Sequence, residues 1–178
     1  MSRLSSIHPE NAAGLTAELF AKIKKAAGRV PNAYATVGSH SPAALAAILG
    51  ADAALAAGSL NKSDVEAIKL AVSEIGGCDY CVAAHTQIGK FAGLSGEAMK
   101  QVRAGLASGN AQRDALVRFV RAIVNSRGTV PEAEVAAVRA GGYSEQQVIE
   151  AILAVSVITF TNLVNRVNDT EIDFPAVA

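Results

Sequence analysis

The chain has 178 residues, of which 51% are hydrophobic and only 4% aromatic, and it contains no Trp. This length fits one domain with a sizeable core, and the many small apolar residues favour close helix packing over aromatic-rich sandwich cores. The 16 basic and 16 acidic residues give a net charge of zero. That balance argues against electrostatic binding to nucleic acid or to an anionic membrane.

Turn residues and helix caps divide the chain into about eight helical segments, and no stretch alternates with the period of two that marks a strand. Ser41, Ser95, Asn110 and Ser144 stand where helix N-caps are expected, and Pro131 stands at a first helical position. The predicted helices span residues 9–27, 42–57, 61–75, 78–92, 96–107, 111–126, 131–140 and 145–167. The sequence therefore predicts an all-α fold.

The location and assembly of the protein are predicted from its apolar segments. The longest apolar run, residues 151–164, contains three hydroxyl residues and an Asn, so we interpret it as a buried helix and not as a membrane span. The N-terminus is polar and lacks the apolar region of a signal peptide. We therefore expect a cytoplasmic protein without a membrane partner. The many small apolar residues also indicate surface buried between subunits of a homo-oligomer.

A weak internal repeat relates two segments. Residues 60–73 and 143–156 match at an offset of 83, with five identical positions that include Leu-Ala-Val-Ser. We predict a single domain over residues 1–178, with a catalytic half at about 41–109 and a structural half at about 110–178. The second copy has Thr161, Val164 and Asn168 at the positions of Cys78, Cys81 and His85.

The only two cysteines, Cys78 and Cys81, form a Cys-x-x-Cys motif, and His85 follows four residues later. On a helix Cys81 lies about 60° from Cys78, and His85 about 40° from Cys81, so all three share one face. Gly76-Gly77 places Cys78 at the helix N-terminus, where the dipole favours a thiolate, whereas His85 favours ionisation of Cys81. The motif therefore predicts thiol–disulfide chemistry.

Two further residues are predicted near these thiols. If the chain reverses at Gly76-Gly77, Glu66 comes within a helical turn of His85 and can orient its imidazole. Ser63-x-x-Glu66 also fits a capping box, which would give Glu66 a structural role instead. Tyr80 lies beside the thiols, and we expect it to pack there or to donate a supporting hydrogen bond.

Other interpretations of the cysteine pair remain open at this point. The two cysteines could be inert, buried small residues. Cys78, Cys81 and His85 could also bind a metal, although no second Cys/His pair completes a four-ligand zinc site. We favour the thiol interpretation and predict neither a metal nor a cofactor.

The spacing Glu66, Cys78-x-x-Cys81, His85 resembles the signature of AhpD-like (alkyl hydroperoxidase D) proteins in the carboxymuconolactone decarboxylase family. The surrounding segment, residues 70–85, is similar to the family core. Val30-Pro31-Asn32, Ser41-Pro42 and the ending 171–175 resemble the peroxidase-related subgroup. The resemblance implies an all-helical fold with an internal duplication, assembled as a homo-oligomer, commonly a trimer or hexamer.

The resemblance also implies a thiol-dependent hydroperoxide reductase. Cys81 would attack the peroxide, Cys78 would form the disulfide, and an external dithiol or protein thiol would reduce it. His85 and Glu66 would act as proton relay. Some family members have a further histidine where this chain has Tyr80, whose phenol titrates too high to shuttle protons easily.

Several alternatives differ from this function. The protein could be a general thiol–disulfide oxidoreductase, or an oligomer whose assembly is switched by its disulfide without peroxide turnover. Decarboxylation of a lactone acid fits less well, because that chemistry needs no thiol pair. The sequence names neither the hydroperoxide nor the reductant.

Overall fold

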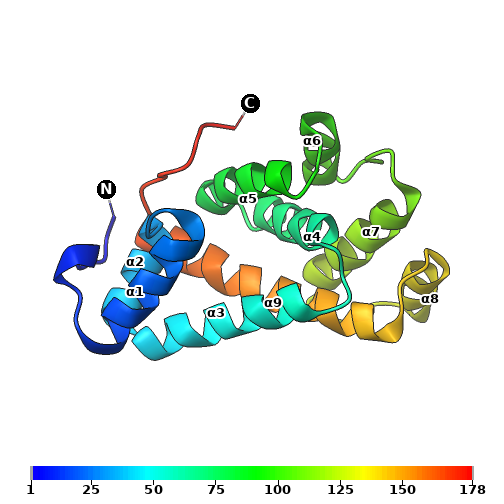
Figure 1. Ribbon diagram of the computed structural model, residues 1–178. Coiled ribbons are helices and arrows are strands. Elements are labelled where there is room, and N and C mark those ends of the chain that lie inside the picture. The colour runs from blue at the N-terminus through cyan, green and yellow to red at the C-terminus, as the bar shows by residue number, and fades with distance from the viewer. Residues whose placement is uncertain (1, 178) are drawn as a thin grey trace.

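The structure, a computed structural model, describes residues 2–177, and these residues form helices and no strands (Figure 1). A short 3-10 helix near the N-terminus is followed by nine α-helices within this range. The helices are η1 (Pro9–Asn11), α1 (Gly14–Ala27), α2 (Asn32–His40), α3 (Pro42–Ala57), α4 (Lys62–Ile75), α5 (Asp79–Phe91), α6 (Gly96–Ala104), α7 (Ala111–Asn125), α8 (Glu132–Ala140) and α9 (Glu145–Asn168).

The predicted all-α fold is confirmed, and nine helices are close to the eight expected. The predicted helix 9–27 instead consists of η1 and α1, which are separated by two extended residues, Ala12 and Ala13. Helix α2 was not predicted, and its N-cap is Pro31. Five of the nine α2 residues are buried, so tertiary packing stabilises a helix too short to be stable alone.

The predicted caps are present. The side chains of Ser41, Ser95, Asn110 and Ser144 each accept a hydrogen bond from the first turn of the helix that follows. Asn61 caps α4 in the same way, and Ser144, 83 residues later, caps α9. These two caps have the offset of the sequence repeat.

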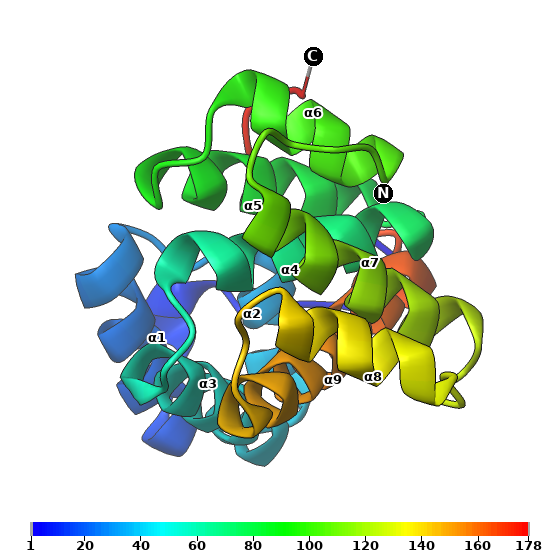
Figure 2. The ribbon, with the colours of Figure 1, turned by 90° about the vertical axis from the view of Figure 1, so that its right-hand side faces the viewer.

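Helix α4 occupies the centre of the molecule and packs against α5, α6, α7 and α9. In Figure 1, α9 runs across the molecule beneath α4 and α5, with α1 to α3 toward one of its ends. The view in Figure 2 places α7 and α8 together on one side, with α6 beyond α5. Ten consecutive α4 residues, Asp64 to Ser73, are buried, so the neighbours of α4 fix its position on all sides.

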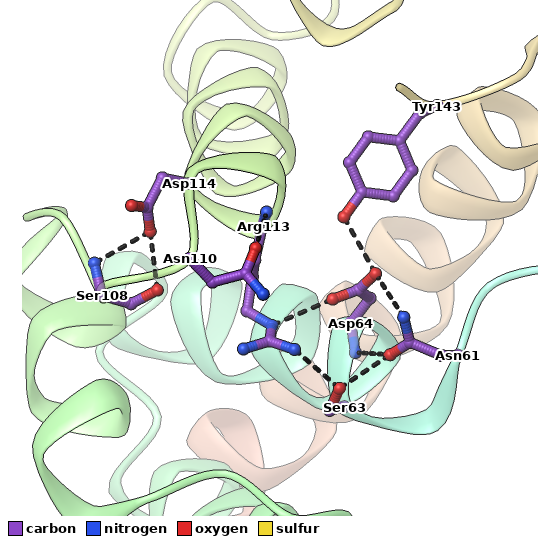
Figure 3. Close-up of polar contacts among 8 residues, drawn as sticks. All are labelled: Asn61, Ser63, Asp64, Ser108, Asn110, Arg113, Asp114 and Tyr143. Carbon is purple, nitrogen blue, oxygen red and sulfur yellow. Dashed lines mark hydrogen bonds and ion pairs between the residues drawn. The ribbon is translucent and has the colours of Figure 1, made fainter. Parts of the chain in front are cut away.

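A buried polar network anchors the N-terminus of α4 (Figure 3). The Asp64 carboxylate accepts hydrogen bonds from Arg113 Nε (2.9 Å), the Tyr143 hydroxyl (2.9 Å) and Asn61 Nδ2 (2.8 Å). Arg113 belongs to α7, and Tyr143 to the loop between α8 and α9. One carboxylate therefore joins three parts of the chain and holds α4, which carries Glu66, in its axial position.

Helix α9 extends beyond the apolar run of the sequence. It has 24 residues with a mean hydropathy of 1.8 over its 18-residue apolar stretch, so by length and composition alone it could cross a membrane. The core helix of a soluble protein has the same properties. Here α9 packs against α2, α3, α4, α5 and α7 on one side, and only 28% of its apolar stretch is buried.

We expect Tyr143→Phe to destabilise the protein by about 1.5–3 kcal/mol, because Asp64 loses one of its hydrogen bonds in a buried site. Urea unfolding followed by circular dichroism measures this change. Glu97→Gln, at an exposed side-chain pair on α6, is the control and should leave the midpoint unchanged. An unchanged midpoint for Tyr143→Phe would show that the network does not anchor α4.

Candidate functional site

A tight reversal at Gly76-Gly77 joins α4 to α5. Gly77 has φ +61°, in the left-handed region that favours glycine. A Cβ atom at Gly76 would lie 2.9 Å from Asn162 Nδ2 of α9, so a side chain at this position would force Asn162 to move. The Cys78 amide then donates to Ser73 O (3.0 Å), and α5 begins one residue later. The turn at Gly76-Gly77 therefore packs closely against α9.

Both thiols lie at the first turn of α5, where Cys78 is the N-cap. Cys78 Sγ accepts a hydrogen bond from the Cys81 amide (3.4 Å), and Cys81 Sγ accepts one from Asn165 Nδ2 of α9 (3.3 Å). Their exposed fractions are only 2% and 3%, and both cysteines are free thiols. The pair is thus buried and reduced, and each sulfur accepts a nitrogen donor.

The two thiols differ in their tendency to ionise. A hydrogen bond from the Cys81 thiol lowers the pKa of Cys78, and this effect and the Cys81 amide outweigh the opposing effect of burial. The pKa of Cys81 is raised, first because its thiol donates to Cys78 and then because it is buried. The first thiolate of the pair therefore forms on Cys78, which agrees with its place at the helix N-terminus.

The reversal brings Glu66 to His85, as the sequence indicates. Glu66 Oε2 lies 2.7 Å from His85 Nδ1, and both side chains are largely buried. Burial raises the pKa of the Glu66 carboxyl, but the charge and hydrogen bond of His85, together with Lys69, outweigh burial and lower it. Glu66 is therefore held as a carboxylate that orients the imidazole, and Asn61, not Ser63, caps the helix.

A cavity of about 590 Å³ lies beside α5 and has both Cys81 and His85 in its wall. Among the described residues no hydrogen bond joins His85 to either sulfur, so a small molecule in this cavity could contact both groups. Much of the wall is apolar. Its apolar residues include Ala84, Ile88, Phe91, Val157, Ile158 and Phe174.

The sequence analysis did not identify several polar residues of this cavity. Lys69 Nζ forms an ion pair with Asp52 Oδ1 (2.7 Å), and the Tyr34 hydroxyl lies 3.5 Å from Asp52 Oδ2. Burial and then the charge of Asp52 raise the pKa of Tyr34. Asn165 was missed as well. No local motif marks these residues, because they come from α2, α3, α4 and α9 and meet only in the folded chain.

Tyr80 supports the C-terminal segment. Its hydroxyl donates to Asp173 Oδ1 (2.8 Å) and accepts from the Ala33 amide (3.1 Å), and burial above all raises its pKa. Its ring meets that of Phe174 edge-on, with 5.5 Å between the centroids. Arg29 forms an ion pair with Asp173 and lies over Phe174, 4.7 Å from the ring centroid. These contacts hold the segment in place as part of the cavity wall.

Residues 2–177 contain no group of three or more His, Cys, Asp or Glu side chains that could hold a metal ion.

Comparison with known proteins finds a family model that matches part of the chain. Residues 41–121, which include the reversal, both cysteines and His85, match the carboxymuconolactone decarboxylase family. The spacing of Glu66, Cys78, Cys81 and His85 that resembles this family in the sequence lies within the matched segment. No curated protein matches the chain.

Solved structures share the fold. The chain is similar to an alkylhydroperoxidase AhpD core, an uncharacterized peroxidase-related protein from Ralstonia eutropha JMP134, with a TM-score of 0.87, 22% identity and coverage of 97% of this chain and 92% of that one. A peroxidase-related protein from Silicibacter sp. TM1040 has a TM-score of 0.77 and 17% identity, with coverage of 96% and 94%. The AhpD-like fold predicted from the sequence is thus confirmed.

The debrominase Bmp8 has the same fold, with a TM-score of 0.80, 20% identity and coverage of 97% of this chain and 93% of that one. A variant of Bmp8 with one cysteine replaced by alanine has been solved in complex with 2,3,4-tribromopyrrole. This fold therefore serves more than one kind of chemistry.

We expect the reduced protein to show one thiolate ionisation below the ordinary thiol pKa of about 8.5 and a second above it. Absorbance at 240 nm, which reports thiolate, should fall as the pH falls through the lower pKa. In Cys81→Ala the pKa of Cys78 should rise toward its ordinary value, because the thiol that donates to it is gone. Two ionisations near 8.5 would contradict this assignment.

Proposed function

We propose that the protein is a cytoplasmic, thiol-dependent hydroperoxide reductase in which Cys81 attacks the peroxide and Cys78 resolves it. One observation carries the proposal: Cys81 and the Glu66-bound His85 lie in the wall of one cavity, with a second thiol hydrogen-bonded to Cys81. A cytoplasmic location suits two buried free thiols, because that compartment keeps thiols reduced.

The first step is the attack on the peroxide. The thiolate of Cys78 takes the proton of Cys81 through the hydrogen bond between them, and the Cys81 sulfur attacks the outer oxygen of ROOH. The O–O bond breaks, Cys81 becomes a sulfenic acid, and RO⁻ leaves as ROH after taking a proton from His85. Glu66 orients the imidazole and supports its positive charge during this transfer.

The second step forms the disulfide. The Cys78 sulfur, losing its proton, attacks the sulfenic sulfur of Cys81, and hydroxide leaves as water. Overall, one hydroperoxide and two thiols give one alcohol, one water and one disulfide. An external dithiol or protein thiol then returns the disulfide to two thiols.

The cavity favours an organic hydroperoxide over hydrogen peroxide. Its wall offers apolar surface to an organic substituent, and its 590 Å³ volume can hold a group much larger than water. Tyr80 takes no part in the relay, because its hydroxyl is already engaged by Asp173 and Ala33. The proton transfers of the reaction therefore use His85 and water.

A second candidate is reductive dehalogenation of an aromatic ring. The specific observation is the apolar cavity next to two thiols, on the fold that Bmp8 uses as a debrominase. The balanced reaction replaces a carbon–bromine bond by carbon–hydrogen, releases HBr and oxidises the two thiols to a disulfide. Release of bromide from a bromopyrrole distinguishes the two candidates. A protein that reduces only hydroperoxides would release none.

We also propose that the protein is a homo-oligomer that pairs through the outer face of α9. Only 28% of the apolar stretch of α9 is buried, which leaves a row of large apolar side chains exposed. Their intervals of three, eight, three and four residues place them on one face of the helix, as a helix–helix seam requires. The row consists of Ile149, Ile152, Phe160, Leu163 and Val167. A second copy of the chain presents the same row, as a two-fold interface requires.

We expect Cys81→Ser to abolish consumption of cumene hydroperoxide in the presence of dithiothreitol, because serine cannot form the disulfide. Glu66→Gln should lower kcat/KM by about 10²-fold, the usual contribution of an oriented acid–base group. Glu74→Gln, the same change on the same helix at a partly exposed ion pair with Arg103, is the control. Turnover by Cys81→Ser at the parent rate would refute the mechanism.

We expect Leu163→Glu to reduce the oligomer to a smaller species in sedimentation velocity, because it puts a charge into the proposed seam. Leu106→Glu is the matched control: Leu106 and Leu163 are 60% and 59% exposed, but Leu106 lies outside α9. An unchanged sedimentation coefficient for Leu163→Glu would place the interface elsewhere. A monomeric parent protein would refute the assembly altogether.

A further inference from the structure

The two sulfurs of the motif line different cavities. Cys81 lies in the wall of the 590 Å³ cavity together with His85. Cys78 instead lies in the wall of a second cavity of about 370 Å³, between the first turn of α5 and the segment that follows α9. Among the residues that the structure describes, Tyr80 and Asn165 alone line both cavities. The disulfide would therefore separate two cavities and be reachable from either side.

Asn165 stands between the two cavities and has an unused acceptor. Its Nδ2 donates to Cys81 Sγ, but its Oδ1 is buried and has no hydrogen-bond partner among the described residues. The residue is 4% exposed, so water does not freely reach this oxygen. An unsatisfied buried acceptor is costly and indicates a donor that arrives with a ligand. A thiol S–H group is such a donor.

The wall of the smaller cavity is mainly acidic where it is charged. It contains the carboxylates of Asp79 and Glu171 and one guanidinium, that of Arg166. Arg3 lies at the same end of α9 but outside this wall, where it donates to backbone carbonyls. The excess of carboxylates favours uncharged or cationic ligands over anionic ones.

We propose that the reductant is a small uncharged or cationic thiol that enters the smaller cavity and attacks Cys78 Sγ, while the hydroperoxide uses the larger cavity. This inference rests on the proposed function, because it concerns the disulfide which that function forms. Oxidant and reductant then do not compete for one entrance. The hydroperoxide thus oxidises the motif at Cys81, and the reductant reduces it at Cys78.

Reduction of the disulfide takes two thiol–disulfide exchanges. The thiolate of the reductant attacks Cys78 Sγ, the Cys78–Cys81 bond breaks, and Cys81 leaves as a thiolate that takes up a proton. A second thiol, from the same dithiol or another molecule, attacks the reductant sulfur of the mixed disulfide, and Cys78 leaves as a thiolate. The reductant becomes a disulfide and the protein regains two thiols.

Two matched variants test the separate entrances. Ile172→Trp narrows the smaller cavity and Ile88→Trp the larger one, at isoleucines that are 45% and 41% exposed. The two half-reactions are measured apart by rapid acid quench, alkylation and mass spectrometry. Diamide-oxidised protein is mixed with dithiothreitol, and reduced protein with cumene hydroperoxide. Circular dichroism checks the fold of each variant.

We expect Ile172→Trp to slow reduction by dithiothreitol about tenfold or more and to leave oxidation within twofold of the parent. Ile88→Trp should do the reverse. Equal effects of Ile172→Trp on both half-reactions, or none on reduction, would overturn the proposal. Because diamide forms the disulfide without peroxide, reduction is tested even if the protein fails to react with hydroperoxide. That failure would refute the proposed function alone.

A charge series on the unsubstituted protein gives an independent test. Cysteamine, 2-mercaptoethanol and 2-mercaptoethanesulfonate are compared at equal thiolate concentration. Reduction should be fastest with the cationic thiol and slowest with the anionic one, and the difference should shrink at high salt. The captured thiol should be found by peptide mass spectrometry on Cys78. Equal rates, or a mixed disulfide on Cys81, would overturn the proposal.

Discussion

The reversal at Gly76-Gly77 is the constraint on which the candidate site depends. It can form because Gly77 has a positive φ and because Gly76 leaves room for the Asn162 side chain. It has two consequences at once. It starts α5 at Cys78, which gives that sulfur the first N–H groups of a helix, and it lays α5 back along α4, which brings His85 to Glu66. A longer or looser turn would lose both the helix start at Cys78 and the contact between His85 and Glu66.

Helix α9 provides the other half of the site through one polar stripe. Asn162 accepts from Ser73 and packs on the reversal, Asn165 donates to Cys81, and Asn168 donates to Thr36 and Thr170. The three asparagines are three residues apart, so they lie on one face, toward the hairpin. No glycine pair interrupts α9 at residues 159–160, 83 positions after the reversal, and the helix runs straight on. Because α9 is continuous, it can pack along both helices of the α4–α5 hairpin.

The sequence predicts the parts of the site that are close along the chain and misses those that are not. Cys78, Cys81 and His85 follow from spacing on one helix, and Glu66 from a single short reversal. Asn165, Lys69 and Asp52 come from separate helices, and polar residues in such positions usually face solvent. Helix α2 was missed for a related reason, because only burial against the rest of the molecule stabilises its nine residues. The catalytic roles, the duplication and the assembly stay predictions.

Which sulfur ionises first and which attacks first are separate questions, and the geometry answers them differently. Cys78 holds the thiolate because it accepts two hydrogen bonds from Cys81 at a helix N-terminus. The same contacts weaken it as a nucleophile, since a stabilised thiolate is less reactive. Cys81 lines the cavity that holds His85, and once its proton has passed to Cys78 its sulfur is the more basic and more nucleophilic one. The N-terminal thiolate thus acts first as a base, and only later as the sulfur that closes the disulfide.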